Sequence, residues 1–92
     1  MEVHCYIISY DLSKPLRDYD GLINAIKQFP MWGRLTESTW AVVTSNTAVE
    51  IRDTLKLHID SDDKLIVIRS GKAAAWTKCL ADNNWIKENI VK

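Results

Sequence analysis

Apolar positions divide the chain into strand-like and helix-like segments. Residues 3–12 carry β-branched and aromatic side chains at odd and even positions alike, which is typical of a central strand covered on both faces. Residues 64–69 form a short apolar run between charges and predict another buried strand. Residues 32–45 are rich in Thr, Val and Trp, and their polar break at Glu37 and Ser38 predicts two adjacent antiparallel strands.

Two amphipathic helices separate these strands. The first is predicted to end before Pro30, because the residue before a proline is disfavoured in the α region. The second is predicted to begin at Thr47, which forms a capping-box pattern with Glu50. The apolar residues at helical spacing are Tyr19, Leu22, Ile23, Ile26 and Phe29 in the first helix, and Ala48, Ile51, Leu55 and Ile59 in the second.

The last part of the chain, residues 72–91, predicts a C-terminal helical segment. The alanine-rich stretch from Ala73 to Leu80 favours helix, and an apolar face resumes at Trp85. The polar residues 82–84 interrupt this pattern. We therefore expect one broken helix or two short ones.

This order of elements predicts a single α+β domain, residues 1–92, with a ferredoxin-like βαββαβ core at about residues 1–70. A chain of 92 residues has room for one hydrophobic core. Right-handed crossovers place the first and last core strands side by side and both helices on one face. The other face is then expected to be covered by the C-terminal segment or by a second subunit.

Charge and cysteine content limit the classes of function. Twelve Lys and Arg balance twelve Asp and Glu, so no overall field attracts nucleic acid or an anionic membrane, and any such binding must be local. Cys5 and Cys79 lie far apart without a metal-ligand spacing, which favours free buried thiols. We find no signal-peptide pattern and no apolar run of membrane-spanning length, so we expect a cytoplasmic protein that does not bind membranes.

Asp11 is the residue most indicative of chemistry, because it ends an apolar central strand and would be held at the rim of a sheet. A hard cation such as Mg²⁺ prefers one or two carboxylates together with waters and phosphate oxygens. One Asp11 per subunit, doubled by a two-fold axis, would suffice for such a site. The alternative is that Asp11 accepts backbone N–H groups in the turn before Pro15.

Hydroxyl and aromatic side chains offer further candidates for binding. Tyr10 and Ser38 can donate to a phosphate at the same rim, although Tyr10 is equally compatible with a packed strand position. An exposed aromatic residue beside Arg34 would suit single-stranded nucleic acid. The four tryptophans are otherwise expected in the core or at an interface, and they are Trp32, Trp40, Trp76 and Trp85.

Several segments resemble those of a known family. The runs Y-I-I-S-Y-D-L at 6–12, R-L-T-E-S-T-W at 34–40, A-V-E-I-R-D-T-L at 48–55, D-D-K-L-I-V at 62–67 and G-K-A-A-A-W at 71–76 resemble the SinR-like proteins, small bacterial and phage proteins of mostly unassigned function. More remotely, the chain is similar to the small ferredoxin-like CRISPR-associated subunit, which serves as nuclease and spacer-integration scaffold, and to VapD-type ribonucleases.

The resemblance implies a homodimer that acts on RNA or DNA as a metal-dependent nuclease. It implies Asp11 as the catalytic, metal-binding residue, with Mg²⁺ near the two-fold axis, and it implies four substrate-binding residues: Tyr10, Arg34, Ser38 and Trp40. Two alternatives stay open because this fold hosts many functions. One is a non-catalytic dimeric module that binds protein or nucleic acid, and the other is a toxin or defence component.

Overall fold

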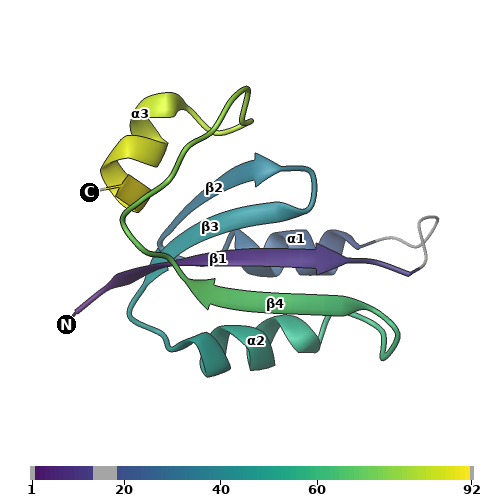
Figure 1. Cartoon of the computed structure of the whole chain (residues 1–92). Coiled ribbons are helices and arrows are strands. Elements are labelled where there is room, and N and C mark those ends of the chain that lie inside the picture. The colour runs from purple at the N-terminus through teal and green to yellow at the C-terminus, as the bar shows by residue number, and fades with distance from the viewer. Residues whose placement is uncertain (1, 14–18, 92) are drawn as a thin grey trace.

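A computed structural model of the chain describes residues 2–13 and 19–91 (Figure 1). The core is a four-stranded antiparallel sheet of β1 (His4–Asp11), β2 (Met31–Thr36), β3 (Thr39–Thr44) and β4 (Lys64–Arg69), in the order β2-β3-β1-β4. The helices α1 (Asp20–Ile26) and α2 (Ala48–Lys56) connect the strands. Strand β1 lies between β3 and β4, so the first and last core strands are neighbours. The ferredoxin-like α+β fold is confirmed.

The main core lies between the sheet and the two helices. Side chains of β1 alternate between the two faces, and Tyr6, Ile8 and Tyr10 are the ones buried toward the helices. Strand β3 adds Trp40 and Val42 to the same face. The helices contribute the buried residues Leu22, Ile26, Ile51 and Leu55, which are all fully buried. The helical spacing of these four positions thus identified the core correctly.

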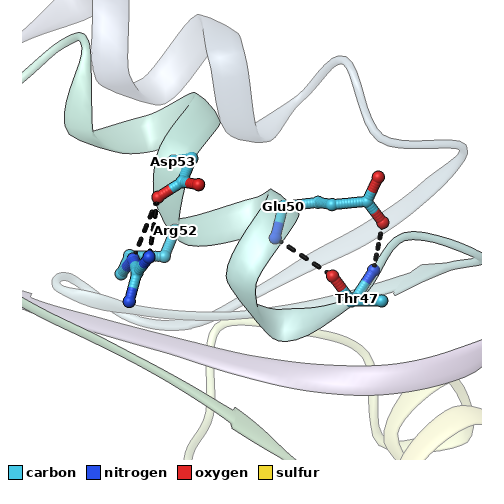
Figure 2. Close-up of polar contacts among 4 residues, drawn as sticks. All are labelled: Thr47, Glu50, Arg52 and Asp53. Carbon is cyan, nitrogen blue, oxygen red and sulfur yellow. Dashed lines mark hydrogen bonds and ion pairs between the residues drawn. The ribbon is translucent and has the colours of Figure 1, made fainter.

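Helix α2 begins at the predicted capping box (Figure 2). The Thr47 hydroxyl accepts a hydrogen bond from the Glu50 backbone N–H at 3.1 Å, and the Glu50 carboxylate accepts one from the Thr47 N–H at 2.8 Å. Together they satisfy two backbone donors that have no partner within the helix. The Arg52–Asp53 contact on the same helix is exposed and contributes little to stability.

The outer face of the sheet, opposite α1 and α2, is covered in part by the C-terminal segment of the same chain (Figure 1). This segment ends in α3 (Asn83–Ile86), which continues directly as the wider π-helical turn η1 (Lys87–Val91). Ile86 and Ile90 are buried against Ala41 of β3. Trp85 lies on Gly33 of β2, where a Cβ atom would come within 2.9 Å of the indole ring. Only a glycine at this position lets the ring approach the strand so closely.

Two predicted helix boundaries are wrong. Residues 72–82 form no helix, and the polar residues 82–84, expected to interrupt one, instead begin α3. The physical reason is that Trp76 and Cys79 pack on the outer face from an irregular backbone, which includes a left-handed residue at Lys78. Helix α1 ends at Ile26, and Phe29 packs on the core from the turn that follows.

Both cysteines are free, as expected from their spacing, but they are half-buried and not fully buried as predicted. Desolvation raises the pKa of the Cys5 thiol, and a hydrogen bond with Ser70 only partly offsets this. Cys5 is therefore a poor nucleophile at neutral pH. No helix within residues 2–13 and 19–91 is long and apolar enough to cross a membrane.

Candidate functional site

A hollow of about 540 Å³ lies where β1 ends, beside the β2–β3 turn and the beginning of α1. Four residues predicted to form the site line it: Tyr10, Asp11, Arg34 and Ser38. The hairpin of β2 and β3 brings Arg34 and Ser38 to β1, because β3 pairs with β1 and the Tyr10 N–H donates to the Ser38 carbonyl at 3.1 Å. Residues far apart in the sequence thus meet at one end of the sheet.

Asp11 presents its carboxylate at the rim of this hollow. Its side chain is 77% exposed, and the Lys64 ammonium lies 3.9 Å from it across the β1–β4 pair. The described residues contain no group of three or more His, Cys, Asp or Glu side chains that could hold a metal ion. One exposed carboxylate fits a hydrated Mg²⁺ that takes its other ligands from water and phosphate, and it does not fit a cation enclosed by protein ligands.

Arg34 is the basic residue among the described residues that line the hollow, and the protein holds its guanidinium in place. The guanidinium stacks on the Trp40 ring, with its central carbon 4.9 Å from the ring centroid, and one terminal nitrogen donates to the Glu37 carbonyl at 2.7 Å. Its Nε is buried without a hydrogen-bond partner. Since a guanidinium has five N–H donors, Arg34 keeps donors for an anion in the hollow.

Tyr10 and Trp40 support Arg34 from beneath. The Trp40 indole N–H donates to the Tyr10 hydroxyl at 3.0 Å, and that hydroxyl donates to the Glu37 carbonyl at 3.3 Å. Trp40 is only 1% exposed, so it has no surface on which a substrate could stack. The Tyr10 hydroxyl is occupied by these contacts. Both residues therefore position Arg34 and the β2–β3 turn, and neither is placed to bind a ligand directly.

Ser38 is exposed at the tip of that turn and lines the hollow with its side chain free of hydrogen bonds to other described residues. Of the other tryptophans, Trp32 is 40% exposed and lies against Trp40, with the Lys27 ammonium 5.3 Å from its ring centroid. It is the tryptophan best placed for contact with a ligand. Trp85 is used in packing on Gly33.

Asp63 is a residue of this region that the sequence pattern did not single out. Its carboxylate accepts hydrogen bonds from the Ser13 N–H at 2.7 Å, the Ser13 hydroxyl at 2.8 Å and the Asp60 N–H at 2.8 Å. The Tyr19 hydroxyl also lies 3.0 Å from it. Asp63 therefore ties the end of β1 and the beginning of α1 to the turn before β4. The one sequence feature that could have indicated this role is that Asp63 directly precedes the strand β4.

The alternative role predicted for Asp11, capping the turn after β1, belongs in part to Asp63, which accepts the Ser13 N–H. The remainder of that turn, with Pro15, lies outside the described residues. Asp11 makes no hydrogen bond within residues 2–13 and 19–91 beyond its strand pairing and the Lys64 contact. The described residues thus leave its carboxylate accessible to a ligand.

We expect the hydrogen bonds of the Asp63 carboxylate to make the protein less stable in acid. Desolvation raises the pKa of Asp63, but the hydrogen bonds from Ser13, Asp60 and Tyr19 more than offset this. Together they lower the pKa from 3.8 to about 2. Because the pKa of Asp63 is lower in the folded state than in the unfolded state, its ionised carboxylate stabilises the fold at every pH above the unfolded-state pKa. This stabilisation disappears as the pH falls from about 4 toward 2. The difference in the free energy of unfolding between wild type and Asp63→Asn, measured in urea, should therefore become smaller over that pH interval. A gap that stays constant with pH would contradict this role.

Comparisons with known proteins identify the fold and no activity. No protein-family model matches the chain. A solved structure, described as a hypothetical protein TT1823 from Thermus thermophilus, is similar with a TM-score of 0.67 and 19% sequence identity, covering 88% of this chain and 100% of that one. At this identity the similarity shows a shared fold alone. The resemblance to SinR-like proteins stays a prediction.

Proposed function

We propose that the protein is a metal-dependent phosphodiesterase that cleaves RNA or DNA at the hollow containing Asp11. The observation that supports this most is that Asp11, Arg34 and Ser38, which come from β1 and the β2–β3 hairpin, line one hollow at the rim of the sheet. A carboxylate, a positioned guanidinium and a hydroxyl are the groups that phosphodiester chemistry uses.

Each residue has a distinct role in this proposal. Arg34 binds non-bridging oxygens of the phosphate, since its guanidinium matches their geometry and is held on Trp40. Ser38 donates a hydrogen bond to the same phosphate from the turn. Asp11 orients the reacting water and, with phosphate oxygens, would hold the cation. When bound, Mg²⁺ would supply charge neutralisation and lower the pKa of a coordinated water.

The activity is tested by incubating the purified protein with end-labelled single-stranded RNA, single-stranded DNA and duplex DNA, each with Mg²⁺, with Mn²⁺ and with EDTA. We expect cleavage of at least one substrate in the presence of a metal and none with EDTA. Complete absence of cleavage in every combination would remove the phosphodiesterase proposal.

Arg34 makes a separate prediction about binding. Arg34→Gln removes a charge-assisted contact, so affinity for a single-stranded oligonucleotide, measured in EDTA by fluorescence anisotropy, should fall about 10- to 100-fold, equivalent to roughly 1.5–3 kcal/mol. Arg52→Gln is the matched control, because Arg52 lies exposed on α2, away from the hollow. Equal affinities for the two variants would place the binding surface elsewhere.

A non-catalytic binding module is the second candidate. It is favoured because Asp11 and Glu37 are the acidic residues lining the hollow in the described part of the chain, and no group of three or more possible metal ligands occurs there. In that case Asp11→Asn binds the oligonucleotide or protein partner as wild type does, and Mg²⁺ leaves the thermal unfolding temperature unchanged. If Asp11 holds the cation, addition of Mg²⁺ should raise the unfolding temperature of wild type and not that of the variant.

A further inference from the structure

Strand β4 has an open edge whose hydrogen-bonding groups can be assigned. The Ser70 N–H donates to the Cys5 carbonyl at 2.9 Å, and these residues continue the register in which Tyr6 faces Arg69. Because hydrogen-bonded and non-bonded pairs alternate along an antiparallel ladder, Ile66 and Ile68 direct their backbone groups toward β1. The N–H and C=O groups of Leu65, Val67 and Arg69 therefore point away from the sheet.

The other edge of the sheet is protected, and the β4 edge is not. Strand β2 has a bulge between Arg34 and Thr36, and the Leu35 carbonyl accepts a hydrogen bond from the Leu80 N–H at 3.0 Å. Bulges and covering segments are the usual protection of sheet edges. No backbone hydrogen bond reaches the outward groups of Leu65, Val67 or Arg69 from the described part of the chain. Ile66 and Ile68 beside them are 54% and 51% exposed.

We propose that β4 pairs antiparallel with β4 of a second copy of this chain, about a two-fold axis at Val67, to form a continuous eight-stranded sheet. The outward set of Leu65, Val67 and Arg69 is symmetric about Val67. In an antiparallel pair Val67 faces Val67 of the second copy and Leu65 faces its Arg69, so every outward N–H meets an outward C=O.

Side chains in this register are complementary. Ile66 lies opposite Ile68 of the second copy, so two half-exposed pairs of isoleucines cover each other on the outer face. Lys64 faces Ser70, and no like charges are directly opposed. Continuing the register beyond the strand brings the exposed Asp62 toward Lys72 of the second copy, twice by symmetry. The acidic turn before β4 and the basic segment after it are thus brought together.

This dimer keeps the two candidate sites apart. Asp11 faces Lys64, three residues from the axis, so the two Asp11 residues would be about 20 Å apart along the strands and about 14 Å apart across them. Each hollow would then use its own Asp11, and the two carboxylates would not share one metal ion. The inference goes beyond the proposed phosphodiesterase activity and does not depend on it, since mass and cross-linking need no substrate.

The interface is tested first by molar mass. Light scattering after size exclusion should give about twice the chain mass of 10.6 kDa for wild type and for Val67→Thr. Val67→Pro removes the outward N–H while leaving the donors that face β1, so it should give the monomer mass with retained circular dichroism. A monomeric wild type across a dilution series, or a folded Val67→Pro that remains dimeric, would overturn the proposal.

A cross-linking experiment tests the register independently of the proline variant. In a Cys5→Ser, Cys79→Ser background, oxidation of a mixture of Ile66→Cys and Ile68→Cys chains should give disulfide-linked dimers, because facing non-hydrogen-bonded residues have Cα atoms about 4.5 Å apart. Either chain alone should link far less, since identical positions lie about 7 Å apart diagonally. Equal linking of the separate chains, or none in the mixture, would refute this register.

Discussion

Trp40→Ala should lower the free energy of unfolding by about 3–5 kcal/mol. The ring is 1% exposed, and its removal leaves a large cavity between β3 and the helices. It also removes the surface on which the Arg34 guanidinium lies and the indole donor to the Tyr10 hydroxyl. For a domain whose whole stability is about 5–15 kcal/mol, this is a large fraction. Urea unfolding followed by circular dichroism measures it.

Trp40→Phe separates packing from hydrogen bonding at the same position. It keeps most of the apolar contact and loses the indole N–H, while the Tyr10 hydroxyl retains the Glu37 carbonyl as a partner. We expect a cost nearer 1–2 kcal/mol. If phenylalanine were as damaging as alanine, the contribution of Trp40 would come from the hydrogen bond and not from its burial.

Gly33→Ala should be destabilising by about 1–3 kcal/mol, although the change adds a single methyl group. The new Cβ would lie 2.9 Å, 3.0 Å and 3.1 Å from three carbon atoms of the Trp85 ring. The ring must then move off β2, and with it the helical turn that buries Ile86 and Ile90. The variant should also show faster proteolysis of the C-terminal segment, measured by limited digestion and mass spectrometry.

Gly71→Ala is the matched control for this prediction. Apart from its two chain neighbours, no described residue comes within 4 Å of a Cβ built at Gly71, so the substitution should be neutral or slightly stabilising through the unfolded chain. Equal effects of alanine at the two positions would mean that the contact between Trp85 and β2 contributes nothing to stability.

The fold could be predicted from sequence because its signals are local and agree with one another. The capping box at Thr47 and Glu50 identified the beginning of α2, and the apolar stripes of α1 and α2 identified their buried faces. The 64–69 run identified β4, but the prediction that this strand is buried was wrong, because β4 lies at the edge of the sheet and exposes Ile66 and Ile68. The C-terminal segment could not be predicted in the same way. Alanine favours helix locally, but Trp76 and Cys79 make their contacts with the sheet from an irregular backbone, and tertiary packing outweighs a weak propensity.

The candidate site was predictable only in part. Asp11 was recognisable as an acid ending a central strand, and the structure places it in one hollow with Arg34 and Ser38. The positioning roles of Tyr10 and Trp40 were hidden, because a sequence does not show that two aromatic side chains share one hydrogen bond beneath an arginine. Asp63 was missed for the same reason, since its partners Ser13 and Tyr19 come from another part of the chain.

The central claim is that Asp11 is required for phosphodiester cleavage. It is tested most directly by comparing the cleavage rates of Asp11→Asn and Asp62→Asn. Both remove one exposed carboxylate, and only Asp11 lines the hollow. The measurement is the initial rate of cleavage of the preferred labelled substrate in Mg²⁺, at equal concentrations of protein of confirmed fold. We expect Asp62→Asn to cleave at the wild-type rate and Asp11→Asn to lose at least about 100-fold. Equal rates for the two variants would contradict the account.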